Sequence, residues 1–123
     1  MRELKFSTNW NKKLCCNVFT TLRLNDQMQI GDLVLVKIKD KNRGIVEILD
    51  KKMIYLSELT DDICYLDTGY NAEETKKILQ TMYKNKNVNW KLKPLYLYFL
   101  KYNIPEILPC VEQAGALKEL KNL

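Results

Sequence analysis

The chain contains no histidine, so it lacks the side chain whose charge changes most readily near neutral pH and which is the commonest protein ligand for metal ions. Serine–histidine and cysteine–histidine hydrolases are therefore excluded, and so are most zinc enzymes. We expect no metal site and no cofactor. Any chemistry has to use hydroxyl, carboxylate, amine, guanidinium or thiol groups.

Long hydrophobic runs are also missing. Residues 1–6 are charged and alternating, and no apolar stretch reaches the length of a signal peptide or a membrane helix. The 4 cysteines include no C-x-x-C pair, and the adjacent Cys15 and Cys16 make a poor disulfide framework. These absences predict a soluble, cytoplasmic protein with buried, reduced thiols and no membrane partner.

What the chain does contain is an excess of basic residues. Lysine and arginine outnumber aspartate and glutamate by 20 to 15, which gives a net charge of +5. Such a balance favours nucleic acids and nucleotides over acidic proteins as partners, although a basic surface can also serve solubility alone. The 123 residues are 46% hydrophobic, which suits one domain with one core.

The most informative stretch is VFTTLRL at residues 18–24. Alternate residues of a strand point to opposite faces, so Phe19, Thr21 and Arg23 share one face, and the other, mostly apolar, residues form a core face. A ring, a hydroxyl and a guanidinium on one face suit an anionic or planar polar ligand. The alternative is an ordinary solvated strand face, because threonine and aromatic residues favour strands.

The remaining pattern predicts an α+β fold. Short helices are expected before and after the central strands, with Ser57 and Asn71 as N-caps of the helices that follow them. Strands are expected at residues 4–6, 18–24, 30–39, 45–49, 53–56 and 95–102, the last one central because it is apolar on both faces. Helices are expected at residues 9–14, 57–68, 71–83 and 105–120.

This order of elements, together with segments 19–23, 31–33, 74–77 and 95–101, resembles the ASCH domains of the PUA-like superfamily. The resemblance covers about residues 3–102. It implies a small mixed PUA-like β-barrel with flanking helices, an RNA-related function and a cleft for a nucleobase. We therefore expect an ASCH-like domain at residues 1–102 and an extra C-terminal helix at residues 103–123, packed on the same domain.

The family motif is glycine, any residue, lysine, two of any residue, threonine, any residue, arginine. Its threonine and arginine fall on Thr21 and Arg23, whereas Cys16 and Val18 occupy the glycine and lysine positions. Some members resemble amidohydrolases of acetylated cytidine, in which the lysine activates the threonine and a glutamate assists. The glutamate position lies beside Asp67 of this chain.

Val18 offers no proton acceptor, so Thr21 with Asp67 suits ligand binding better than hydrolysis. The leading hypothesis is a module that binds RNA, single-stranded nucleic acid or a modified nucleoside in a cleft lined by Thr21, Arg23 and Asp67. Lys12 and Lys13 would contact phosphate, the alternative being a solvated helix edge. The candidate stacking residues are Trp10, Phe19, Tyr65 and Tyr70.

Two other hypotheses stay open. One is an amidohydrolase of N-acylated cytidine-type nucleosides, with Thr21 as nucleophile, Asp67 as the assisting acid or base, and Lys12 or Lys13 reaching in from the preceding helix. Whether the protein is an enzyme is therefore undecided at this level. The other is an interaction protein that forms a homodimer through its C-terminal helix.

Overall fold

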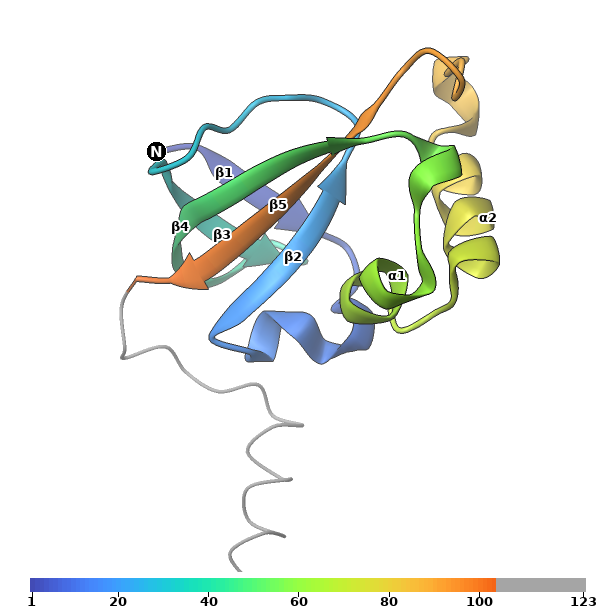
Figure 1. Ribbon diagram of the computed structural model, residues 1–123. Helices are drawn as coiled ribbons and strands as arrows, with labels where there is room; N and C mark the ends of the chain where they lie inside the picture. Colours follow the sequence, from blue (N-terminus) through green and yellow to red (C-terminus); the bar gives the residue numbers. More distant parts are fainter. Residues whose placement is uncertain (104–123) are drawn as a thin grey trace, which may run out of the picture.

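The structure is a computed structural model that describes residues 1–103 (Figure 1). It has the expected α+β class, and its strands form one curled, five-stranded mixed sheet. The strands are β1 (Glu3–Phe6), β2 (Val18–Arg23), β3 (Leu33–Ile38), β4 (Lys41–Ile54) and β5 (Leu95–Tyr102). The helices are α1 (Asp61–Asp67) and α2 (Ala72–Met82), with short 3-10 helices η1 (Trp10–Cys15), η2 (Leu56–Glu58) and η3 (Lys84–Lys86).

The strand order is β1-β3-β4-β5-β2, so β1 and β2 are the two outer strands. β1 runs parallel to β3, and the other neighbours are antiparallel. The prediction that residues 95–102 form a central strand is confirmed, because β5 pairs with both β4 and β2. The sheet curls into a half-barrel that brings the outer strands toward each other (Figure 1).

The connection between β3 and β4 is tighter than the sequence predicts. Ile38 pairs with Lys41, and the two residues between them, Lys39 and Asp40, have φ angles of 48° and 66°. Two left-handed residues in a two-residue loop match the twist of the flanking strands. β4 then runs without a break to Ile54, through residues 50–52 that are predicted to separate two strands, and its register against β5 shifts between Ile48 and Asp50.

The helix starts are partly as predicted. Asn71 caps α2, since its side chain accepts a 2.9 Å hydrogen bond from the Glu74 amide. Ser57 is not the cap of α1, because it lies inside η2 and Thr60 accepts from the Ile63 amide instead. The chain needs the extra turn of η2 to leave β4 before α1 can begin.

Two apolar clusters cover the two faces of β2. One draws on all five strands and includes Phe6, Phe19 and Tyr102, so it fills the concave side of the sheet. The other joins Leu22 and Leu24 to residues of η2, α1, α2 and β5, so it lies between the sheet and the helices. Val18, predicted to belong to the core, is instead 48% exposed at the start of β2.

Other predictions concern thiols, membranes and the C-terminal end. The prediction of buried, reduced thiols is confirmed for Cys64, but it is wrong for Cys16, which is free and exposed, and for Cys15, which is disulfide-bonded. In the described part of the chain, no helix combines the length and apolar character needed to cross a membrane. The predicted C-terminal helix and the dimer through it fall on residues 104–123, outside the described residues.

Candidate functional site

A pocket opens beside the outer edge of β2, where this strand meets η1, α1 and α2. Thr21 and Arg23 of β2, Lys13 of η1 and Asp67 of α1 all line it. The three residues predicted to share a cleft therefore come together, and one of the two candidate lysines joins them. The apolar and aromatic lining includes Phe6, Trp10, Leu22, Leu79, Met82 and Tyr83.

The pocket is small, with a volume of about 90 Å³. A cavity that holds a benzene ring measures about 150 Å³, so the space takes the edge of one ring. A whole nucleoside would extend beyond it.

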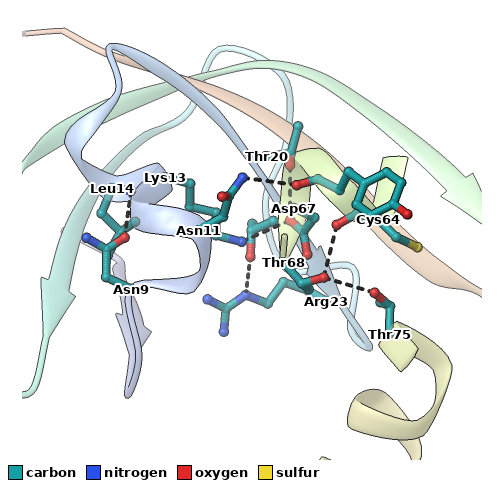
Figure 2. A network of polar contacts seen from close by, with 12 residues as sticks. Asn9, Asn11, Lys13, Leu14, Thr20, Arg23, Cys64, Asp67, Thr68 and Thr75 are labelled. Atoms are coloured by element: carbon teal, nitrogen blue, oxygen red, sulfur yellow. Dashed lines mark hydrogen bonds and ion pairs between the residues drawn. The ribbon is translucent and has the colours of Figure 1, made fainter. Parts of the chain in front are cut away.

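The most buried polar contact of the pocket joins Lys13 to Asp67 (Figure 2). Nζ lies 2.9 Å from Oδ1, and the two side chains are only 5% and 6% exposed. Oδ1 also accepts a 3.0 Å hydrogen bond from the Thr20 hydroxyl. Burial lowers the pKa of Lys13 from its ordinary value, and this outweighs the Asp67 carboxylate, which acts to raise it.

Arg23 lies across the pocket from this pair. Its Nε donates to Thr21 Oγ1 at 3.1 Å, and its Nη2 donates to the backbone carbonyl of Lys5 at 3.2 Å. The guanidinium carbon lies 4.6 Å from the centre of the Phe6 ring. Burial lowers the pKa of Arg23, but a guanidinium starts high enough to remain charged. Because these bonds use two of its five N–H groups, Arg23 has donors left for a ligand.

A left-handed turn in η1 explains why Lys13 points into the pocket. Asn11 and Lys12 have φ angles of 55° and 53°, a backbone conformation that residues other than glycine seldom adopt. Asn11 Nδ2 donates to the Tyr65 carbonyl at 3.0 Å, which fastens η1 to α1 (Figure 2). Gly69 makes room for this contact, since a Cβ there would lie 3.3 Å from the Asn11 side chain.

The other predicted ligand-binding residues lie outside the pocket lining. Lys12 is exposed, and Phe19 is only 4% exposed in the concave cluster, where it packs on Tyr102. Tyr70 is 42% exposed and meets the edge of Trp10 at 6.2 Å between ring centres. The stacking role predicted for Phe19 is therefore wrong, because the curl of the sheet covers its ring with other side chains.

The alternation of residues 18–24 predicts Thr20 on the core face, and the sequence gives Phe6 no role in the site. Thr20 is half-buried and donates to Asp67, and Phe6 lies under both pocket cations. The sequence does contain a signal for Thr20, because it is the polar residue on the otherwise apolar face of β2. Nothing local distinguished Phe6 from an ordinary core residue.

The geometry separates the Thr21 hydroxyl from the proposed assisting carboxylate. Thr21 Oγ1 receives its hydrogen bond from Arg23, whereas Asp67 is bonded to Thr20 and Lys13. A ligand therefore meets a hydroxyl held by a cation, which is suited to hydrogen bonding. Among residues 1–103, no three histidine, cysteine, aspartate or glutamate side chains gather in a way that would hold a metal ion.

The chain matches no protein-family model, and the searches of curated proteins and of solved structures found no match either.

Proposed function

We propose that the protein is an ASCH-like, PUA-related module that binds a nucleotide of RNA or of another single strand, with the base edge in the pocket. The observation that carries this proposal is the meeting of Thr21, Arg23 and Asp67 in one hollow together with Lys13. These residues come from β2, α1 and η1, and their combination of donors and acceptors is what a base edge requires.

The contacts already made inside the pocket leave specific groups for a ligand. Thr21 accepts from Arg23, so its own hydroxyl proton is available to donate. Asp67 is engaged through Oδ1, and Oδ2 offers lone pairs to an amino group. A base with an amino group next to ring acceptors, as in cytosine, fits this pattern, since carboxylates accept from the cytosine amine.

Binding of labelled single-stranded RNA, measured by fluorescence anisotropy against salt, tests the proposal. We expect binding that weakens as salt rises, and a loss of about 1–3 kcal/mol in Arg23→Gln. Lys101→Gln is the matched control, because it removes one positive charge from an exposed residue at the far end of β5. Absence of binding at low salt, or unchanged binding by Arg23→Gln, would contradict the proposal.

One observation favours amidohydrolase activity as a second candidate. The family motif position for lysine is Val18, but Lys13 brings an amine to Asp67 from η1. In this candidate, Thr21 Oγ1 would attack the N-acyl carbonyl carbon, and its proton would pass through Lys13 and Asp67 to the cytosine amine, which leaves as the C–N bond breaks. Water would then hydrolyse the acyl ester on Thr21 and release the free acid.

Release of cytidine from acetylcytidine tests this second candidate. We expect Thr21→Ala to abolish turnover and Thr20→Ala to reduce it, because Thr20 only orients Asp67. Turnover that survives Thr21→Ala excludes this residue as the nucleophile. A wild-type protein that releases no cytidine is not this hydrolase.

A further inference from the structure

A second hollow adjoins the pocket on the other side of Arg23. It has a volume of about 260 Å³ and is lined by residues of β1, by the segment after β2 and by Tyr83. We call it the outer hollow; its polar lining includes Arg2, Glu3, Lys5, Arg23, Asn25 and Gln27. Lys5, Arg23 and Tyr83 line both spaces, so a ligand can extend from one into the other.

The outer hollow is positively charged. Arg2, Lys5 and Arg23 contribute three cations, and Glu3 contributes the single carboxylate. Glu3 is already paired, since its Oε1 lies 3.2 Å from Lys37 Nζ. The positive charge of the hollow is therefore not neutralised by its own lining.

Size and charge together indicate how a ligand divides between the two spaces. The pocket takes only the edge of one ring, so the sugar and any phosphate have to lie outside it. The outer hollow is the larger of the two, and each space is lined by three cations and one carboxylate. In the pocket the carboxylate of Asp67 pairs with the lining residue Lys13, whereas Glu3 of the outer hollow pairs with Lys37 outside its lining. Phosphate oxygens form strong, charge-assisted hydrogen bonds with such a group of cations.

We propose that the outer hollow binds a phosphate group, so that the ligand is a phosphorylated nucleotide and not a nucleoside. This inference rests on the proposed function, because it takes the base to lie in the pocket. It adds a recognition site at β1, through Lys5 on the strand and Arg2 just before it, to the residues of the pocket itself. A nucleoside would leave this second site empty and would bind more weakly.

Calorimetric titration with the four common nucleosides and their 5′-monophosphates tests the inference. We expect a monophosphate to bind about tenfold more tightly than its nucleoside, as one charge-assisted hydrogen bond allows. The double variant Arg2→Gln/Lys5→Gln should abolish this difference. The single variant Arg2→Gln, whose residue lines only the outer hollow, should reduce it and leave nucleoside affinity unchanged. Both side chains are exposed, and the bond from Arg23 goes to the backbone of Lys5, so the fold should persist.

Lys77→Gln/Lys101→Gln is the matched control, since it removes the same charge from exposed residues outside both hollows. Equal affinity for nucleoside and monophosphate would overturn the phosphate site and leave the proposed function standing. An equal loss in the control variant would also overturn it, because the effect would then be one of net charge. Binding of neither ligand class would overturn the base pocket as well.

Discussion

Two lysine–aspartate pairs in this protein have nearly the same geometry in opposite environments. Lys13 and Asp67 are 2.9 Å apart with side chains 5% and 6% exposed, whereas Lys51 and Asp26 are 2.8 Å apart with side chains 18% and 36% exposed. Burial lowers the pKa of Lys13, but the hydrogen bond with Asp26 raises the pKa of Lys51. The carboxylate acts to raise the lysine pKa in both pairs, and the burial of Lys13 reverses the net shift in the first.

The difference indicates separate roles for the two pairs. Lys51 also donates to the Met28 carbonyl and to Gln29, so the surface pair fastens the segment between β2 and β3 onto β4. The buried pair takes two charges out of water, and apolar residues of similar volume would hold the fold as well or better. Its presence at a pocket therefore suits the ligand-binding role proposed above better than a purely stabilising role.

Removing the carboxylate of the buried pair should have the largest effect. Asp67→Ala leaves the Lys13 ammonium without its counter-charge in a buried place, and we expect a loss of about 3–5 kcal/mol in the free energy of unfolding. Denaturant-induced unfolding followed by circular dichroism measures this loss. A loss no larger than that of Asp26→Ala would show that the buried pair is solvated after all.

Replacing both partners sharpens the same point. We expect Lys13→Met/Asp67→Leu to unfold within about 1 kcal/mol of the wild type, because no charge is left unpaired. The double variant should nevertheless lose nucleotide binding in the anisotropy assay. Binding that persists in this stable variant would separate the pair from the site.

The next effect in size concerns the turn that directs Lys13 inward. Asn11→Ala places an ordinary side chain at a φ of 55° and removes the bond to Tyr65, so we expect a loss of about 1–2 kcal/mol together with weaker nucleotide binding. Asn11→Gly is the matched variant, since glycine accepts this φ and only the bond is lost. Equal stability of the two variants would mean that the left-handed conformation carries no strain.

The two pairs should also respond to pH in opposite directions. The unfolded chain keeps the Lys13 proton up to about pH 10.5, while the folded protein releases it earlier, so the Lys13 contribution to stability rises with pH in the window below 10.5. Lys51 has a folded pKa above 10.5, so its contribution is present below that pH and is lost above it. Unfolding of Lys13→Met and Lys51→Met, compared with the wild type across the alkaline range, measures both slopes. Slopes of the same sign would contradict the comparison.

Asp26→Ala should have the smallest effect of the series. Lys51 keeps its bonds to Met28 and Gln29 and remains close to water, so little is left unsatisfied. Added salt should remove most of any change, because exposed pairs are screened. Thermal unfolding at low and high salt measures this. A salt-independent loss would show that Asp26 acts through its other contact, the hydrogen bond from the Tyr98 hydroxyl.

Local patterns were enough to predict several parts of the fold. The Asn71 cap and the central position of β5 follow from neighbouring residues alone, so their prediction succeeded. The prediction that Ser57 caps the next helix failed, because Ser57 lies in η2 and Thr60, three residues later, offers the same hydroxyl at the start of α1. Short polar residues near a strand end do not by themselves reveal which one starts the helix.

The site was harder to predict, because it depends on turns and curvature that the sequence pattern does not contain. Thr21, Arg23 and Asp67 were named from a motif remnant, but their distances depend on how α1 packs beside β2. Lys13 and Lys12 are equivalent in sequence, and only the left-handed turn directs one inward and the other to solvent. Phe19 lies on the same face of β2 as Thr21, but the curl of the sheet buries its ring in the cluster on the concave side.

The curl of the sheet brings its two outer strands, β1 and β2, toward each other. A side-chain hydrogen bond bridges them there, since Arg23 of β2 donates to the carbonyl of Lys5 on β1, in addition to the ring contact between Phe6 and Phe19. An anion that recruits this guanidinium competes with that carbonyl and can loosen the bridge without breaking any backbone pairing. Amide hydrogen exchange in the N-terminal strand would then report occupancy of the neighbouring hollows.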